Sequence, residues 1–128
     1  MKPVADLKEA FEAQGLDPNV LPDVSMIPEQ YREAITSFYQ MMVVTDAINE
    51  NKEPDWNNMN DEKWFPVTTV DADEERPAGF GLSLHGTGFT RTFTHLGSRL
   101  SYREESGAIH SFENFKPLWE GFLLKIKK

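Results

Sequence analysis

Three histidines give this chain side chains suited to proton transfer or metal binding near neutral pH: His85, His95 and His110. His85 and His95 each end a segment with strand-like alternation, so a hairpin would bring the two imidazoles together. A metal site usually needs three or four ligands in defined geometry, and neither a His-x-His nor a His-Glu-x-x-His spacing occurs. We therefore interpret the histidines as polar surface residues and expect no metal and no cofactor. A small enzyme with a cleft near His85 and His95 is the third of three functional hypotheses.

Carboxylate runs and glycine-rich stretches are the other features with catalytic potential. The run Asp73–Glu75 is typical of a solvated turn, and general acid–base chemistry would also need a perturbed pKa. The tripeptide Gly86–Gly88 lacks the Gly-Lys-Ser/Thr of a phosphate loop and lies between two predicted strands. Glycine tolerates positive φ, so we expect a tight hairpin turn there. The sequence thus favours a protein without enzymatic activity.

A strand predicted over residues 89–95 carries aromatic and cationic side chains on one face: Phe89, Arg91, Phe93 and His95. Arg99 and Arg103 are predicted on the neighbouring strand. Aromatic rings interleaved with arginines can stack the bases of single-stranded nucleic acid. The alternative places both phenylalanines in the core, with Arg91 paired at the end of the sheet. We prefer the core interpretation because the chain has a net charge of −8, which opposes nucleic acid.

Tryptophans are the remaining candidates for partner binding, because they often form the centre of protein interfaces. Trp56 stands alone in a polar loop over residues 53–63, where it would either bind a partner or hold the loop in place. Trp64 opens a predicted strand, and Trp119 lies on the last predicted helix. The sequence therefore predicts four possible partner-binding residues: Trp56, Arg91, Arg99 and Arg103.

Helices are predicted at both ends of the chain. Val4, Leu7 and Phe11 share a helical face, with Pro3 at the first position and a stop at Gly15. A longer helix begins at Pro28 and ends near residues 49–51, before Pro54. Its apolar residues recur every three or four positions, which is typical of a helix that faces a core. The last helix covers residues 109–123, and Pro117 should kink or split it.

The middle of the chain predicts strands. Trp64 to Val70 is rich in aromatic and β-branched residues, and Pro66 indicates an edge position. An acidic turn over residues 71–77 leads to a second strand over 80–85, followed by strands over 89–95 and 99–103. We expect one α+β domain over residues 1–128. It would be an antiparallel meander of three to four strands, packed by two N-terminal helices and one C-terminal helix.

Composition restricts the possible functions. The chain has 128 residues, 39% of them hydrophobic, which suffices for the core of one domain. Without cysteine it has no disulfide or thiolate metal site. Residues 1–78 carry 6 Lys/Arg and 17 Asp/Glu, whereas residues 79–128 carry 7 and 4. The acidic balance disfavours nucleic acid and anionic membranes, although the basic C-terminal half weakens that argument.

Several stretches resemble one family: Leu21–Glu29, Glu53–Asn58, and Gly79–Gly81 with Leu96–Leu100. The chain is similar, over most of its length, to short uncharacterised proteins of prophage and phage-like regions in gut bacteria. The last helix of these proteins ends in an aromatic-rich segment, which Phe115–Leu124 resembles. Pro117 departs from that pattern. The resemblance implies a bacterial cytoplasm or a virion as the location. It implies no activity and no site residues.

We therefore expect a non-enzymatic accessory protein of a phage-like element that binds a protein partner. The partner would be a second copy, a phage protein or a host protein. The first alternative is a nucleic-acid-associated protein that uses the arginines named above and the basic C-terminus, Lys125 to Lys128.

Overall fold

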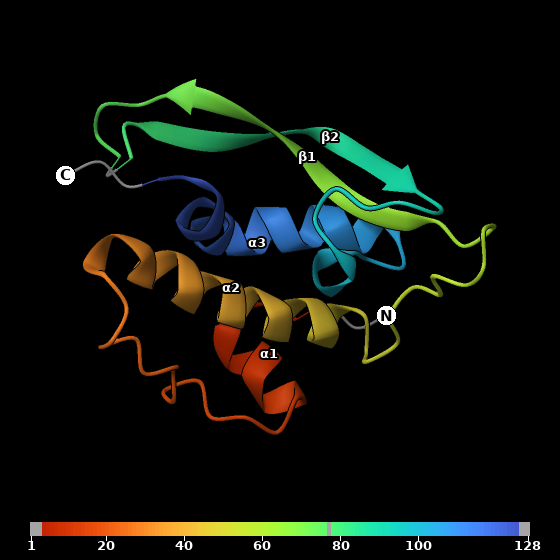
Figure 1. Ribbon diagram of the computed structural model, residues 1–128. Coiled ribbons are helices and arrows are strands. Elements are labelled where there is room, and N and C mark those ends of the chain that lie inside the picture. Colours follow the sequence, from red (N-terminus) through yellow and green to blue (C-terminus); the bar gives the residue numbers. More distant parts are fainter. Residues whose placement is uncertain (1–3, 77, 126–128) are drawn as a thin grey trace.

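A twisted hairpin of two strands covers one side of three helices (Figure 1). The computed structural model describes residues 4–76 and 78–125. The elements are α1 (Leu7–Ala13), α2 (Glu29–Ile48), β1 (Lys63–Ala72), β2 (Phe80–Thr90), the 3₁₀ helix η1 (Ser98–Leu100) and α3 (Glu105–Leu123). The hairpin packs on α3, α3 packs on α2, and α1 packs on the far side of α2. The α+β class is confirmed, with the helices on one face of the sheet.

The two N-terminal helices begin later than the sequence predicted. In α1 the Asp6 side chain accepts the Glu9 N–H at 2.9 Å, so Asp6 is the capping residue and the helix starts at Leu7. Pro3, the predicted first position, lies outside the described residues. Gly15 has a φ of 68°, as expected of a helix stop. Pro28 precedes α2 as its cap rather than opening it.

The last helix is bent next to its proline, as predicted. Phe115 has φ −131° and ψ 29°, which interrupts the helical path two residues before Pro117. Proline has no N–H to donate and its ring collides with the preceding turn, so the helix bends there. The bend keeps both halves of α3 against the core, since Phe112 and Trp119 are both buried.

The sheet has two strands over residues 4–76 and 78–125, so the predicted meander of three to four strands is wrong. β1 and β2 are antiparallel, and their register runs from Lys63 opposite Thr90 to Ala72 opposite Phe80. The tight turn predicted at Gly86–Gly88 does not form, because these glycines lie inside β2 beside a β-bulge. The Phe65 ring covers Gly88, where a Cβ would lie 2.8 Å from Phe65 Cζ. Gly88 is therefore needed for close packing rather than for a turn.

The real turn of the hairpin is the acidic segment between the strands. The Asp73 N–H donates to the Gly79 carbonyl at 3.0 Å, and the Gly79 N–H donates to the Arg76 carbonyl at 2.9 Å. Gly79 has a φ of 80°, a conformation that favours glycine. The acidic turn predicted over residues 71–77 is found in this part of the chain, but it begins later, because β1 continues through Ala72. β2 continues past Gly86–Gly88, where the sequence suggested a second turn.

The third and fourth predicted strands are replaced by irregular chain and by η1. The Thr94 hydroxyl accepts the Gly97 N–H at 2.7 Å, and the Ser101 hydroxyl donates to the Gly97 carbonyl at 2.9 Å. These local bonds fold residues 97–101 into a turn and a 3₁₀ helix. Of the predicted strand 99–103, only Tyr102 pairs with the sheet, through a single antiparallel bridge to Trp64.

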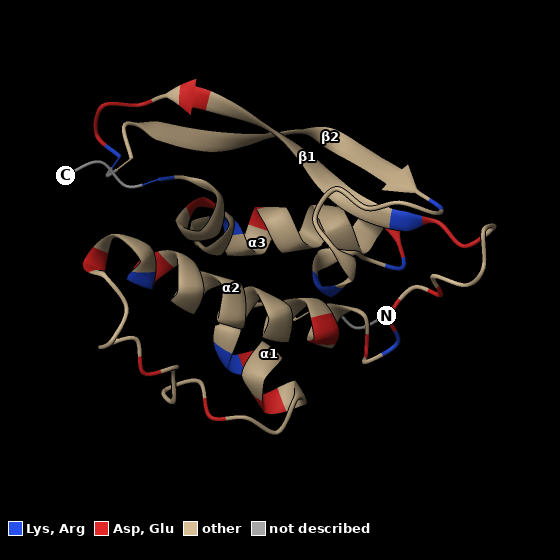
Figure 2. Ribbon diagram, in the orientation of Figure 1, with Lys and Arg blue, Asp and Glu red and all other residues tan. Residues whose placement is uncertain are grey.

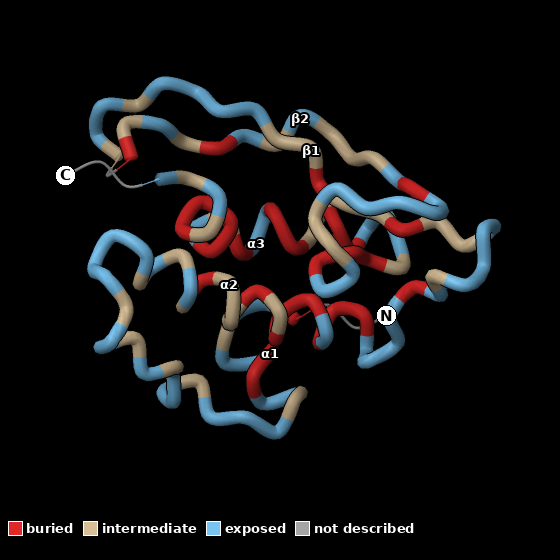
Figure 3. Tube along the Cα trace, in the orientation of Figure 1, coloured by how far each residue is buried: buried red, intermediate tan, exposed pale blue. Residues whose placement is uncertain are grey.

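The core lies between α3, α2 and the inner face of the hairpin (Figure 3). Its largest fully buried side chains include Trp119, Tyr102 and Met41. α2 and α3 approach closely at Gly121, where a Cβ would lie 2.3 Å from Ser37 Oγ. Within residues 4–76 and 78–125, no helix combines the length and apolar character needed to cross a membrane.

Candidate functional site

A group of aromatic rings, two of them exposed and one half-buried, lies at the open end of the hairpin, where β1 begins and β2 ends. The His95 ring centroid is 4.8 Å from that of Phe65 and 5.7 Å from that of Phe93. Phe93 is 62% exposed, although it is a large apolar side chain. We call Phe65, Phe93 and His95 the aromatic cluster. Exposed aromatic side chains of this kind are enriched in binding surfaces.

A second stacked pair lies on the opposite face, because Trp64 and Phe65 are consecutive residues of one strand. The ring centroids of Trp64 and Phe89 are 4.9 Å apart. The Arg91 guanidinium lies 5.4 Å from the centre of the Phe89 ring, and an Arg91 nitrogen lies 3.6 Å from a Glu62 oxygen. Arg91 is therefore both stacked and charge-paired.

The preferred interpretation of this segment, with both phenylalanines in the core, is wrong. Phe89 is 46% exposed and Phe93 is 62% exposed. β2 ends at Thr90, so residues 91–97 follow no strand alternation and Phe93 is not placed on an inner face. The pairing of Arg91 at the end of the sheet, which belonged to the same interpretation, is observed.

A groove runs from the aromatic cluster along the outer edge of β1. It has a volume of about 200 Å³. Its lining comes from β1, the loop before η1 and the end of α3: Phe65, Pro66, Val67, Thr68, His95, Leu96, Trp119 and Leu123. These lining residues include no carboxylate and only one imidazole, so they offer no acid–base pair. The groove suits an apolar side chain.

His85 lies in β2, whereas His95 lies in the loop between β2 and η1. His85 is the extra residue of the β2 bulge, since Gly86 pairs with Val67 and Leu84 pairs with Thr68. It is exposed and is not among the residues that line the groove beside His95. The described residues contain no group of three or more His, Asp or Glu side chains that could hold a metal ion.

Trp56 covers a buried lysine. Lys63 is fully buried, and its ammonium lies 5.4 Å from the centre of the Trp56 ring. Lys63 Nζ donates to the carbonyls of Asn58 and Arg91, each at 2.8 Å. Trp56 and Lys63 therefore hold the 53–62 loop against the end of β2, which is the arrangement expected of a loop anchor. A partner-binding role for the half-buried Trp56 stays a prediction.

The structure does not place Arg99 and Arg103 on a strand beside Arg91. Arg99 is an exposed residue of η1, and its guanidinium donates to Met42 Sδ on α2 at 3.8 Å. Arg103 lies between η1 and α3, where its backbone N–H donates to Asn49 Oδ1 at 3.1 Å. Figure 2 shows that Lys and Arg at this end of the molecule alternate with Asp and Glu. The predicted strand carrying Arg99 and Arg103 beside Arg91 is therefore wrong.

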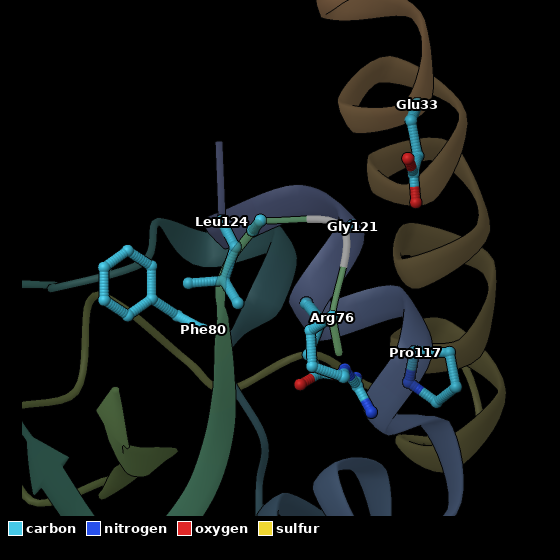
Figure 4. A pocket seen from close by; sticks show the side chains of 8 residues that line it. Glu33, Arg76, Phe80, Pro117, Gly121 and Leu124 are labelled. Atoms are coloured by element: carbon cyan, nitrogen blue, oxygen red, sulfur yellow. The ribbon is translucent and has the colours of Figure 1, made fainter. Parts of the chain in front are cut away.

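A second depression lies at the tip of the hairpin (Figure 4). It has a volume of about 190 Å³ and is lined by residues of the turn, α2 and α3. Arg76 from the turn forms an ion pair with the buried Glu120 of α3, and Glu120 also accepts the Leu82 N–H at 2.9 Å. Figure 4 shows Arg76 between Phe80 and Pro117, with Glu33 above it on α2. Because Arg76 already pairs with the buried carboxylate of this depression, we interpret the pair as the attachment of the hairpin tip to α3.

Sequence reasoning missed the groove and the Arg76–Glu120 pair. A signal for the pair was present, since Glu120 follows Trp119 directly on the apolar side of the last predicted helix. A charged residue in that position is usually paired when it is buried. The groove had no such signal, because its lining combines three segments that are far apart in the sequence.

Comparisons of the chain with models of known protein families, with curated proteins and with solved structures found no match.

Proposed function

We propose that this chain is a non-enzymatic protein-interaction module whose binding surface is the hairpin end. That surface consists of the aromatic cluster and the groove beside it. The observation that carries the proposal is the exposure of Phe93, which is 62%, directly beside the apolar groove. Aromatic side chains are enriched in protein interfaces, and ligand pockets are lined mainly by apolar side chains.

Charge supports a protein partner over a nucleic acid. Glu62 competes with phosphates for the paired Arg91, and Lys63 is buried under Trp56, out of reach of phosphates. The whole chain carries −8, which repels a polyanion. Nucleic-acid binding through the stacked Arg91 and Phe89 is the competing function.

The sequence resemblance supplies the biological part of the proposal. It supports an accessory role in a prophage or phage-like element, in a bacterial cytoplasm or a virion. The partner would then be a second copy of the chain, a phage protein or a host protein. This part rests on the resemblance alone.

An affinity experiment tests the proposal. The tagged protein is incubated with nuclease-treated host lysate at about 0.1 M and about 0.5 M salt, beside the variants Phe93→Ser and Met26→Ser. Met26 is 91% exposed in the loop before α2 and serves as the matched control. We expect a stoichiometric protein that survives high salt, is lost with Phe93→Ser and is kept with Met26→Ser.

Two results would contradict the proposal. One is a partner whose retention does not depend on Phe93. The other is a salt-sensitive mobility shift of labelled single-stranded DNA that needs Arg91 and Phe89, with no protein retained, which would establish the nucleic-acid function instead.

A further inference from the structure

The two outer edges of the hairpin differ in how their backbone groups are satisfied. On β2, Glu120 of α3 accepts the outward Leu82 N–H at 2.9 Å. On β1, Trp64 exchanges two backbone hydrogen bonds of 2.9 Å with Tyr102. Beyond that bridge, the part of the chain that the structure describes adds no third strand to β1. The outer edge of β1 is therefore open for the rest of its length.

Backbone alternation identifies the groups on this edge. Neighbouring residues of a strand direct their N–H and C=O groups to opposite sides. Because Trp64 faces Tyr102 rather than β2, the residues at 66, 68, 70 and 72 face the same way. Pro66 has no N–H, so the donors of the open edge are Thr68, Val70 and Ala72. Val70 is 56% exposed, and Figure 3 shows the end of β1 as exposed.

The groove lies directly below the start of this edge. Thr68 belongs both to the open edge and to the groove, whose floor includes Trp119 and Leu123 of α3. A strand added to the edge would direct every second side chain toward α3. One of these side chains would enter the groove, and the apolar lining of the groove would favour an apolar side chain at that position.

The far end of the same edge is acidic. Asp71 is the next-to-last residue of β1, and the turn that follows carries Asp73, Glu74 and Glu75 (Figure 2). Asp71 accepts the Ser83 hydroxyl at 2.6 Å, and Asp73 accepts the Glu75 N–H at 3.1 Å, so both are held by neutral donors. These bonds do not neutralise the two carboxylates. The carboxylates therefore favour a cationic side chain on a segment bound alongside them.

We propose that an extended segment of a partner protein adds as a third strand to the outer edge of β1 over residues 66–72. The segment places an apolar side chain in the groove and a Lys or Arg beside Asp71 and Asp73. Tyr102 shows the same mode within the chain, since it already adds one extended residue to this edge. The inference rests on the proposed function and names the class of partner.

The experiment selects a phage-displayed library of random short peptides on the wild-type protein. Enriched peptides are then measured by fluorescence anisotropy against Val70→Pro and the matched control Val70→Thr. Proline removes the Val70 N–H, whereas threonine keeps it and suits a strand. We expect peptides with alternating apolar residues and a Lys or Arg at one end. Their affinity should fall about tenfold or more with Val70→Pro and stay unchanged with Val70→Thr.

A second measurement does not depend on the proline variant folding. Hydrogen exchange of the Thr68 and Val70 amides in the wild-type protein should slow about tenfold or more when an enriched peptide is bound. No enrichment, or no protection of these amides, overturns the inference. A dimer of the wild-type protein that becomes monomeric with Val70→Pro, without peptide binding, also overturns it and assigns the edge to a second copy. If the peptide selection fails while Phe93→Ser still abolishes partner retention, the proposed function stands without this inference.

Discussion

The Tyr102 hydroxyl lies at the centre of a buried hydrogen-bonded chain. It lies 2.8 Å from the Thr45 hydroxyl and 2.6 Å from the Ser111 hydroxyl, and Trp119 Nε1 donates to Ser111 at 3.1 Å. Tyr102→Phe removes this hydroxyl and leaves Thr45 without that partner. We expect the free energy of unfolding to fall by about 1–2 kcal/mol in urea denaturation.

Tyr31→Phe is the control, because Tyr31 is 54% exposed and its hydroxyl can bond water. Equal stability of the Tyr102→Phe and Tyr31→Phe variants would show that the buried hydroxyl contributes nothing.

The same residue makes stability depend on alkaline pH. Burial raises the pKa of Tyr102 from 10.0 to about 12, and the hydrogen bonds to Ser111 and Thr45 only partly oppose this effect. Above about pH 10 the unfolded chain releases a proton that the folded protein keeps, so stability falls as the pH rises toward about 12. The unfolding temperature of the wild-type protein should therefore fall more between pH 9 and about 11 than that of Tyr102→Phe. Parallel curves for the two proteins would contradict this assignment.

At the scale of elements, the close contact between α2 and α3 depends on a glycine, Gly121, which has no side chain. A Cβ at Gly121 would lie 2.3 Å from Ser37 Oγ and 3.2 Å from Ser37 Cβ. Alanine favours helices, yet we expect Gly121→Ala to destabilise the protein by about 1–3 kcal/mol because the contact becomes overpacked. Chemical denaturation measures the change.

Two further variants make that prediction specific. Ser37→Gly removes both colliding atoms, so the double variant should be more stable than Gly121→Ala alone. At Gly86 a Cβ would meet no atom within 4 Å, and Gly86→Ala is the matched control. A Gly121→Ala protein as stable as the wild type would mean that the helices are not packed this closely.

Helices were easier to predict from this sequence than strands, for a physical reason. The apolar periodicity of α2 is local and its ends carry Pro28 and a polar stop, so the sequence alone locates it. The alternation of apolar and polar residues over 80–95 is also local, but it continues from β2 into the loop that follows. It therefore does not show where the strand ends. Whether Gly86–Gly88 turns or continues depends on the Phe65 ring across the hairpin, which no local pattern reports.

In the candidate site, too, local features could be predicted from the sequence and long-range contacts could not. The segment containing Phe89, Arg91 and Phe93 was recognised from its composition, but the exposure of both rings follows from where β2 ends. The groove depends on Leu96, Leu123 and β1 meeting in space, so it could not be predicted. The position of Arg99 depends on the local bonds of Gly97, which replace a strand with η1.

At the scale of the whole molecule, the hairpin tip is joined to the helices by a buried charge. Glu120 is 7% exposed and satisfies both Arg76 and the Leu82 N–H. We expect Glu120→Ala to lower the free energy of unfolding by about 1–3 kcal/mol, since a buried N–H loses its acceptor. Arg76 is partly exposed, so water screens the ion pair and reduces its share of this loss.

A double-mutant cycle separates the two contributions. Arg76→Ala should lower the free energy of unfolding more in the wild-type background than in the Glu120→Ala background. Only in the wild-type background does it leave a buried carboxylate without its cation. Glu120→Gln keeps an acceptor for Leu82 and should lie between the wild type and Glu120→Ala. Additive losses would show that Arg76 and Glu120 do not interact.

The burial of Lys63 has a consequence for chemical labelling. An amine-reactive acylating reagent needs contact with the lysine nitrogen, and Lys63 Nζ is enclosed by Trp56, Asn58 and Arg91. Lys8, whose side chain is 76% exposed, should react at once, whereas Lys63 should react only when the end of the hairpin opens. Equal rates by mass spectrometry would contradict this burial. The natural sequence thus contains a time-resolved reporter of opening at the very end where partner binding is proposed.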